Sequence, residues 1–400
     1  MQYAFCGHTG YQQGEVLYVP FKNISSLYLA FGGDCTSDKD TYSFTCTNSC
    51  TIGNICFNSA DQDPSQDPSA VSCHIQRAFD CNQGLTKLSD ETLKNFKRFK
   101  SVYSYSCTNG QLDKTSKHYN RLTYTFAHCR NLETIEKNWL DNWLVTPAQE
   151  VELLYTFKKC IKLREADLSP IIGYTKSLDG TFDQCKNLET CILGARTEPL
   201  SMSSTFWGNN SLKTVKCTAT SSDNEIDLSG LTYITNLAQT FTNCKNLKQI
   251  KFANNLNNAT NIALKSTFSG CTSLEKVDLT ALTPYLNNTQ VVVYTANTLL
   301  IAPTSTKSNA SAFENTFKDC SSLDTVQFAD GVNENSIGMP STFLGCKKLQ
   351  TVENLTAFTH LTDLNQTFSG CEQLGKVEFD VTSTHDVEHL YRTFFNCKKI

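Results

Sequence analysis

The sequence predicts a repeat solenoid, a stack of coils of about 25 residues that each contribute one short strand. The first observation is that segments such as QTFTNCKNLKQIKF, STFSGCTSLEKVDL and QTFSGCEQLGKVEF are variants of one motif. The second is regular spacing, because strong copies anchored on phenylalanine follow one another at intervals of 24 to 35 residues, with a single interval of 49. A catalytic motif is needed only once per site, so a motif that recurs this often indicates architecture.

Each part of the motif predicts one element of a coil. The full pattern is apolar-x-x-T-F-x-x-C-x-x-L-x-x-apolar-x-apolar. Its last part, as in Leu274, Val277 and Leu279, ends in an alternation of period two, which predicts a short strand. Its first part, L-x-x-T-F, carries apolar residues three and four apart, which predicts a helical or 3₁₀ turn on the opposite wall. The G-C, N-C or D-C pair between them marks a tight turn.

The apolar positions of the motif predict the core. One coil cannot bury its own Leu, Phe and Val, so stacked coils share one continuous core. The period and the leucine spacing lie in the range of leucine-rich repeats, so the predicted fold class is an α/β solenoid of that kind. The predicted core residues are Phe126, Cys129, Leu132, Phe182, Cys185, Leu188, Phe241, Cys244, Leu247, Phe268, Cys271, Leu274, Phe317, Cys320, Leu323, Phe343, Cys346, Leu349, Phe368, Cys371 and Leu374.

The interval of 49 residues between Phe268 and Phe317 is about twice the usual spacing. It predicts a degenerate coil inside the interval, in which Leu286 and Val293 take the offsets of the motif and Gln290 replaces the phenylalanine.

The repeat resembles the BspA-like leucine-rich repeats and the related repeats of mycoplasma-type surface lipoproteins, whose core unit is F-x-x-C-x-x-L-x-x-I/V-x-L. The resemblance covers residues 122–400. It implies a bacterial or protist surface protein implicated in adhesion to matrix, host cells or other microbes. We therefore expect a non-enzymatic protein, without a cofactor, that presents an extended surface to a protein or glycan ligand.

The cysteines fall into two sets. In the first set, most coils place a cysteine at one repeat position, and the coil of Phe206 has Asn209 there. Parallel side chains on one ladder converge poorly for disulfides, so we expect buried free thiols, with a metal or redox column as the alternative. The second set lies in residues 1–110, which we predict to be a Cys-rich N-terminal cap with degenerate repeats. Free thiols and disulfides are both open alternatives for this set. The solenoid then covers 111–400, and its last repeat is incomplete.

Three tryptophans are candidates for ligand binding. Trp139 and Trp143 lie in NWLDNWL with a spacing that suits an amphipathic helix, so they either pack inward or form an exposed platform for sugar or protein. Trp207 begins the long interval of 35 residues and is a third candidate.

One motif offers an enzymatic alternative. His385 to His389 match H-x-x-E-H, a zinc-hydrolase signature that needs both histidines on one helix face. The motif lies in a linker between two repeats and Leu390 is already a core position, so no long helix fits. We therefore predict no metal site and no enzyme.

Charge and hydropathy restrict the partners and the location. The 35 basic and 39 acidic residues give a net charge of −4, so no overall basic field favours nucleic acid. No segment reaches the ~18 apolar residues of a membrane span. The start, MQYAFCGHTG, lacks the pattern of a signal peptide, so a cell-surface or secreted location requires a signal or anchor outside the given chain. A phage or virion fibre or decoration protein, which folds in a cytosol, is the alternative.

Overall fold

The structure is a computed structural model. It describes residues 16–19, 26–32, 34–37, 44–47, 50–52, 54–57, 72–89, 93–94, 101–108, 111–137, 139, 150–257, 262, 264–286, 289–295, 304–331, 333–379 and 387–400, and also residue 9. The chain divides into two compact units. The N-terminal unit holds residues 1–188 with 294–306, and the C-terminal unit holds 189–293 with 307–400.

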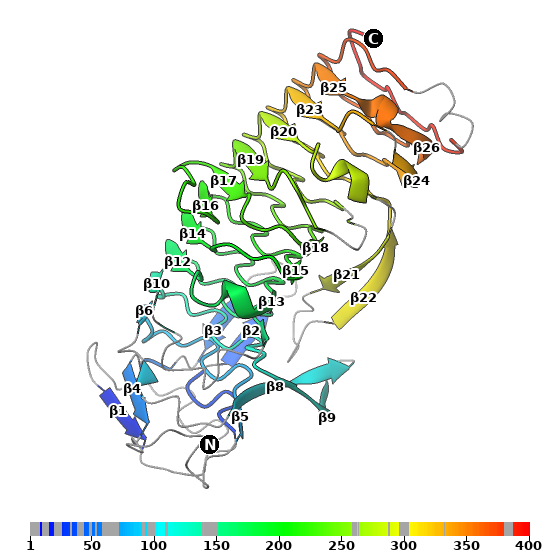
Figure 1. The fold of residues 1–400 in the computed structure, drawn as a ribbon. Coiled ribbons are helices and arrows are strands. Elements are labelled where there is room, and N and C mark those ends of the chain that lie inside the picture. The colour runs from blue at the N-terminus through cyan, green and yellow to red at the C-terminus, as the bar shows by residue number, and fades with distance from the viewer. Residues whose placement is uncertain are drawn as a thin grey trace. The chain divides into compact units, whose positions relative to one another are not determined.

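Each unit is built on a parallel sheet to which successive coils contribute one short strand (Figure 1). The parallel order follows from the coil geometry, because every coil runs round the stack in the same direction. The N-terminal unit contributes β6 (Lys87–Leu88), β10 (Thr134–Ile135) and β12 (Glu165–Asp167). The C-terminal unit contributes β14 (Thr190–Ile192), β16 (Thr214–Lys216), β17 (Ile226–Leu228), β19 (Gln249–Phe252), β20 (Lys276–Asp278), β23 (Thr325–Gln327) and β25 (Thr351–Glu353).

The strand register aligns the same repeat position in neighbouring coils. Ile250 pairs with Val277, Val277 with Val326, and Val326 with Val352. These side chains are buried, whereas the residues on either side of them on β20 and β25 are exposed. The predicted strand, one per coil with a period of two, is confirmed.

Shorter sheets and 3₁₀ turns complete the coils. The other walls hold the pairs β11 (Val151–Glu152) with β13 (Thr175–Ser177), β15 (Leu200–Ser201) with β18 (Ile234–Asn236), and β24 (Asn333–Gly338) with β26 (Phe358–Asp363). Helical structure among the described residues is limited to the 3₁₀ turns η2 (Ile172–Tyr174), η3 (Thr283–Tyr285) and η4 (Leu355–Ala357). No helix in the described part of the chain is long and apolar enough to cross a membrane.

The first 120 residues add further strands. β1 (Val16–Val19), β4 (Asn54–Phe57) and β7 (Leu93–Lys94) form a parallel sheet. β2 (Asp34–Ser37) and β3 (Phe44–Thr47) form an antiparallel pair, and β5 (Ser72–His74), β8 (Ser101–Thr108) and β9 (Gln111–Tyr119) form a third sheet.

The turn before the phenylalanine differs from the prediction. Instead of a helical turn, two consecutive tight turns occupy this wall, as in the bonds from Thr181 N to Leu178 O at 2.9 Å and from Cys185 N to Phe182 O at 3.1 Å. The third residue of each turn has a positive φ, 63° at Gly180 and 59° at Gln184. Positive φ at that position is the mark of a type II turn, and it stops a right-handed helix from continuing.

The degenerate coil predicted between Phe268 and Phe317 is not present. Phe268 N donates to Thr316 O at 2.9 Å and the two phenylalanine rings stack at 5.4 Å, so their coils are direct neighbours. The extra residues include β21 (Thr289–Thr295) and β22 (Thr304–Ala310), which pair with each other and are drawn in yellow in Figure 1. The long interval is therefore one coil with an insertion.

The core is a ladder of stacked phenylalanines. Neighbouring rings lie 5.2 to 5.9 Å apart with nearly parallel planes, and Phe31 and Phe79 belong to the ladder of the N-terminal unit. The predicted core residues from Phe126 to Leu374 are fully buried. The prediction is wrong for Leu390, whose side chain is 60% exposed, because no later coil packs on it in the part of the chain that the structure describes. A leucine-rich-repeat solenoid is therefore the fold, as predicted.

Candidate functional site

The repeat cysteines link each coil to the one before it. Each described repeat thiol donates a hydrogen bond to the carbonyl oxygen of the repeat phenylalanine in the preceding coil, with sulfur–oxygen distances of 3.0 to 3.2 Å. Eight of the repeat threonines also link neighbouring coils, because their hydroxyls donate to the carbonyl of the leading apolar residue of the preceding coil at 2.7 to 2.9 Å. These carbonyls also accept a main-chain N–H of their own coil, so the two ladders give each of them a second hydrogen bond, and that second bond joins neighbouring coils.

The thiol ladder does not behave as a metal or redox column. Cys160, Cys185, Cys271 and Cys346 are free thiols with no exposed surface. Burial raises the pKa of each of them, because a thiolate is disfavoured away from water. Metal binding and oxidation both need the thiolate, so these groups are structural.

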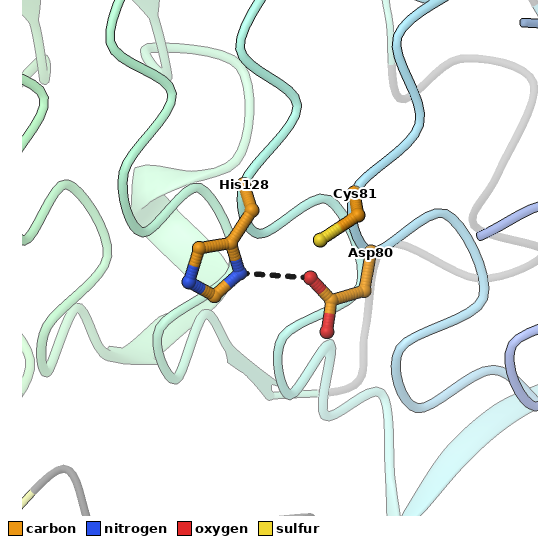
Figure 2. Close-up of side chains that lie close together, drawn as sticks. All are labelled: Asp80, Cys81 and His128. Atoms are coloured by element: carbon orange, nitrogen blue, oxygen red, sulfur yellow. Dashed lines mark hydrogen bonds and ion pairs between the residues drawn. The ribbon is translucent and has the colours of Figure 1, made fainter. Parts of the chain in front are cut away.

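Asp80, Cys81 and His128 form a buried cluster that we tested as a metal site (Figure 2). One ligand atom of each lies within 4.8 Å of the others. Asp80 and Cys81 follow Phe79 in one coil, and His128 follows Phe126 in the next. This pairing has no signal in the sequence, because the two coils are separated by a long connection and the contact depends on their stacking.

The chemistry of the cluster does not fit a metal. Cys81 is disulfide-bonded, so its sulfur is not a thiolate. Both oxygens of Asp80 are committed, Oδ2 to Arg77 Nε at 2.5 Å and Oδ1 to His128 Nδ1 at 2.8 Å. Although burial alone raises it, Arg77 and His128 hold the pKa of Asp80 below its ordinary value. Burial lowers the pKa of His128. The cluster combines the ion pair of Arg77 with Asp80 and a hydrogen bond between Asp80 and His128, and that hydrogen bond joins two coils.

A second buried ion pair lies on the same corner of the N-terminal unit. Lys158 Nζ bonds Asp183 Oδ2 at 2.7 Å, and it lies 4.7 Å from the centre of the Tyr155 ring. Lys158 and Asp183 are 3% and 4% exposed. Beside them, burial and the nearby charge of Lys158 lower the pKa of Lys159 to about 8. This corner is the most heavily charged interior region that the structure describes.

The predicted tryptophan platform is not supported at Trp139. Its side chain is 1% exposed and packs edge-on against Phe126 and Phe157 at 6.1 and 5.6 Å, so it belongs to the core and offers no surface to a ligand. Trp143 lies outside the described residues. Trp207 is half-buried at a turn and stays a candidate.

The zinc-hydrolase alternative also loses its structural basis. His385 lies outside the described residues, and His389 is exposed in a β-bridge to Asp363. Leu364 N donates to His389 O at 2.9 Å, so the backbone at the second histidine is extended. The motif requires a helix at this point.

Alternate side chains of the main sheet of the C-terminal unit face solvent in aligned rows. On β20 the exposed residues are Lys276 and Asp278, and the register places Gln327 and then Glu353 in the row that Asp278 begins. Lys251 on β19 is exposed as well. We call this surface, with its exposed residues from β19, β20, β23 and β25, the sheet face.

A polar groove borders the sheet face where the strands begin. It has a volume of about 320 Å³. Four successive coils contribute to it, each through the residues that follow its repeat cysteine. Its lining residues are Glu275, Lys276, Ser322, Asp324, Lys348, Gln350 and Gln373. Sequence reasoning missed the groove, although the polar residues two and four positions after each cysteine are its signal.

Comparison with known proteins places the chain in a family. Residues 153–227, 224–334 and 293–400 match the model of the BspA type leucine rich repeat region, in six copies. No curated protein matches the chain.

Three solved structures are similar to this chain at low identity. A leucine-rich repeat protein from Eubacterium ventriosum is 14% identical, with 87% of this chain and 83% of that chain covered and a TM-score of 0.37. One from Bacteroides ovatus is 16% identical, with 95% and 85% covered and a TM-score of 0.33. A leucine rich cell surface protein from Faecalibacterium prausnitzii is 11% identical, with 94% and 91% covered and a TM-score of 0.22. With its family model matched from residue 153 to residue 400, the chain belongs to the BspA-type leucine-rich repeat proteins.

Proposed function

We propose that this chain is a non-enzymatic binding protein that acts at a cell surface and holds a macromolecular ligand on the sheet face of its C-terminal unit. Membership of the BspA-type family supports a surface binding role. The buried polar side chains bond in pairs, Asp80 with His128 and Lys158 with Asp183. Their role is therefore to stabilise the contact between coils.

The observation that carries the proposal is the alignment of exposed side chains across neighbouring strands. Asp278, Gln327 and Glu353 lie in one row because their strands pair in register. The strands beneath them are held by the phenylalanine, cysteine and threonine ladders, so the row is fixed before a ligand arrives. Binding groups on rigid strands lose little conformational freedom on binding, which favours affinity.

The test is attachment of the purified, labelled chain to cultured epithelial cells. The variant Asp278→Lys/Glu353→Lys reverses two charges on the sheet face. Its control, Asp330→Lys/Glu334→Lys, makes the same change of charge at exposed positions away from that face. We expect the first variant to bind at least ten-fold less and the control to bind like the parent.

Treatment of the cells separates the two ligand classes. Protease removes cell-surface proteins, whereas periodate oxidises glycans, so the treatment that abolishes attachment identifies the class. Equal attachment of both charge-reversal variants would contradict the assignment of the sheet face. Absence of attachment by the parent chain would contradict the proposed function.

A further inference from the structure

The polar groove is a built feature of the coil stack. Its lining residues are joined by main-chain hydrogen bonds, from Asp324 N to Glu275 O at 2.8 Å and from Gln350 N to Asp324 O at 2.9 Å. In addition, Gln350 Nε2 donates to Asp324 Oδ1 at 2.6 Å, which orients that carboxylate. The groove therefore presents polar groups from four coils, with Asp324 and Gln350 held by their mutual hydrogen bond.

The charges of the groove argue against an anionic ligand. Glu275 and Asp324 are balanced by Lys276 and Lys348, so the lining carries no net charge at neutral pH. A site for phosphate, sulfate or a polyanionic chain needs an excess of cations to offset the loss of water from the ligand. The groove has no such excess.

The lining also lacks the anchors typical of a protein ligand. All seven lining residues are charged or polar, with no aromatic and no branched aliphatic side chain among them. Protein interfaces gain most of their affinity from aromatic and arginine anchors in dry pockets. A ligand that fits this groove must instead be neutral and able to donate and accept many hydrogen bonds.

Polyhydroxylated chains meet these requirements. A hydroxyl both donates and accepts, so it can bond an amide, a carboxylate and an ammonium in turn. Neighbouring coils repeat the polar groups at the spacing of strands in a sheet, about 4.8 Å. This spacing is comparable to the advance of one sugar ring along an extended glycan chain.

Gly375 leaves one end of the groove open. It follows Cys371 at the position that Glu275, Asp324 and Gln350 hold in their own coils. A Cβ atom built on Gly375 would meet nothing within 4 Å. A ligand chain can therefore continue past the groove along this row, and a large side chain placed there would obstruct it.

We infer that the groove lined by Glu275, Asp324, Gln350 and their neighbours binds a segment of a neutral glycan chain laid across the coils. This inference names the ligand class and rests on the proposed function only for its biological setting. Glycan hydroxyls exchange hydrogen bonds with the amides of Gln350 and Gln373 and with the two carboxylates, and the lysines donate at the rim.

The experiment is retention of the labelled chain on an array of immobilised neutral, sialylated and sulfated glycans. The blocking variant is Gly375→Trp, and its control is Gly173→Trp, the same change at another exposed glycine whose Cβ would meet nothing within 4 Å. A second variant, Gln350→Ala/Asp324→Ala, removes polar groups without adding bulk. Thermal unfolding of each variant checks that it is folded.

We expect retention on a set of neutral glycans, with at least a ten-fold loss for Gly375→Trp and for Gln350→Ala/Asp324→Ala, and no loss for Gly173→Trp. Retention of the parent on no glycan, or only on sialylated or sulfated ones, would overturn the inference. So would equal retention of all folded variants. The array contains no cells, so the two proposals can fail separately. Retention on glycans without attachment to cells would contradict the proposed surface function and would still support the groove as a glycan site.

Discussion

The corner that follows the repeat phenylalanine differs between the two units of the molecule. In both units the second residue after the phenylalanine has a positive φ. The N-terminal unit places His128, Lys159 and Gln184 there, whereas the C-terminal unit places residues such as Asn243 and Gly270 there. Glycine and asparagine adopt this conformation readily, but other residues lose roughly 1–2 kcal/mol in it.

The difference shows that the repeat has two kinds of position. The phenylalanine, threonine and cysteine ladders run through both units, because the phenylalanines fill the core and the threonines and cysteines hydrogen-bond its carbonyls. The corner is free to diverge, and the N-terminal unit has filled it with the hydrogen-bonded pair of Asp80 and His128 and with the ion pair of Lys158 and Asp183. We therefore expect substitutions to have equal effects on stability in the two units at ladder positions and unequal effects at corner positions.

The largest unequal effect is expected at the buried ion pair. Lys158→Met leaves Asp183 buried and unpaired, which should lower the free energy of unfolding by about 3–5 kcal/mol. Lys158→Met/Asp183→Leu removes both charges and should recover most of the loss. Lys318→Met changes the same repeat position in the C-terminal unit, where the side chain is half-exposed, and should change stability by less than about 0.5 kcal/mol. Urea unfolding of the three variants checks this, and similar losses for Lys158→Met and Lys318→Met would contradict it.

The thiol ladder should give equal effects in the two units. Cys160→Ala and Cys271→Ala each remove a buried sulfur and one of the two hydrogen bonds that a buried phenylalanine carbonyl accepts, the other coming from the main chain of its own coil. Each should lower the free energy of unfolding by about 1–2 kcal/mol. Cys271→Ser retains a donor and should lose less. If the alanine variants at both positions were neutral, the hydrogen bonds would not contribute to stability.

Two asparagines at the cysteine position of the repeat offer a sharper contrast. Asn82 donates to Phe31 O at 2.8 Å and to Ile52 O at 3.0 Å, whereas the amide of Asn209 is buried and has no hydrogen-bond partner in the structure. Asn209→Cys should raise the free energy of unfolding by about 1–2 kcal/mol, and Asn82→Cys should lower it by about 1–3 kcal/mol. If the calorimetric unfolding midpoints of the two variants moved in the same direction, the difference in hydrogen bonding between Asn82 and Asn209 would not determine their contributions to stability.

A smaller effect is expected from the titration of His128. Because burial lowers the pKa of His128 in the folded state below its ordinary 6.5, the unfolded chain binds the proton more readily. The contribution of His128 to stability is therefore complete above about pH 6.5 and falls below it, by at most ~1.4 kcal/mol per pH unit. His128→Asn removes the titration and suits the positive φ of 56°. Urea unfolding at pH 7.5 and pH 5.5 should show a smaller fall for the variant, and an equal fall in both proteins would contradict the prediction.

The sequence was sufficient to predict the ladder and the strand, because both depend on spacing within one coil. It was insufficient to predict contacts between side chains of neighbouring coils. The contact of Asp80 with His128 joins residues 48 positions apart in the chain. The insertion after Leu286 resembles a degenerate coil in the sequence, because its length is close to one period and its apolar residues match the motif.

The tight turns could have been predicted from the sequence. Gly, Asn or Asp before the cysteine, as in Gly270 and Asn243, is the residue choice for a positive φ, and a residue with positive φ cannot continue a helix. The candidate site was harder to predict from the sequence. Trp139 fitted an exposed platform equally well until its packing against Phe126 was known, and the polar groove consists of residues that resemble ordinary surface.

The measurement that tests the account most directly is alkylation of the native chain at neutral pH, followed by mass spectrometry of its peptides. If a shared ladder of buried, hydrogen-bonded thiols holds both units, Cys160 and Cys271 should be labelled only when the chain unfolds, and the half-buried Cys397 should be labelled before them. Rapid labelling of Cys160 or Cys271 in the folded protein would show that the ladder is open, and it would contradict the common core on which the comparison of the two units depends.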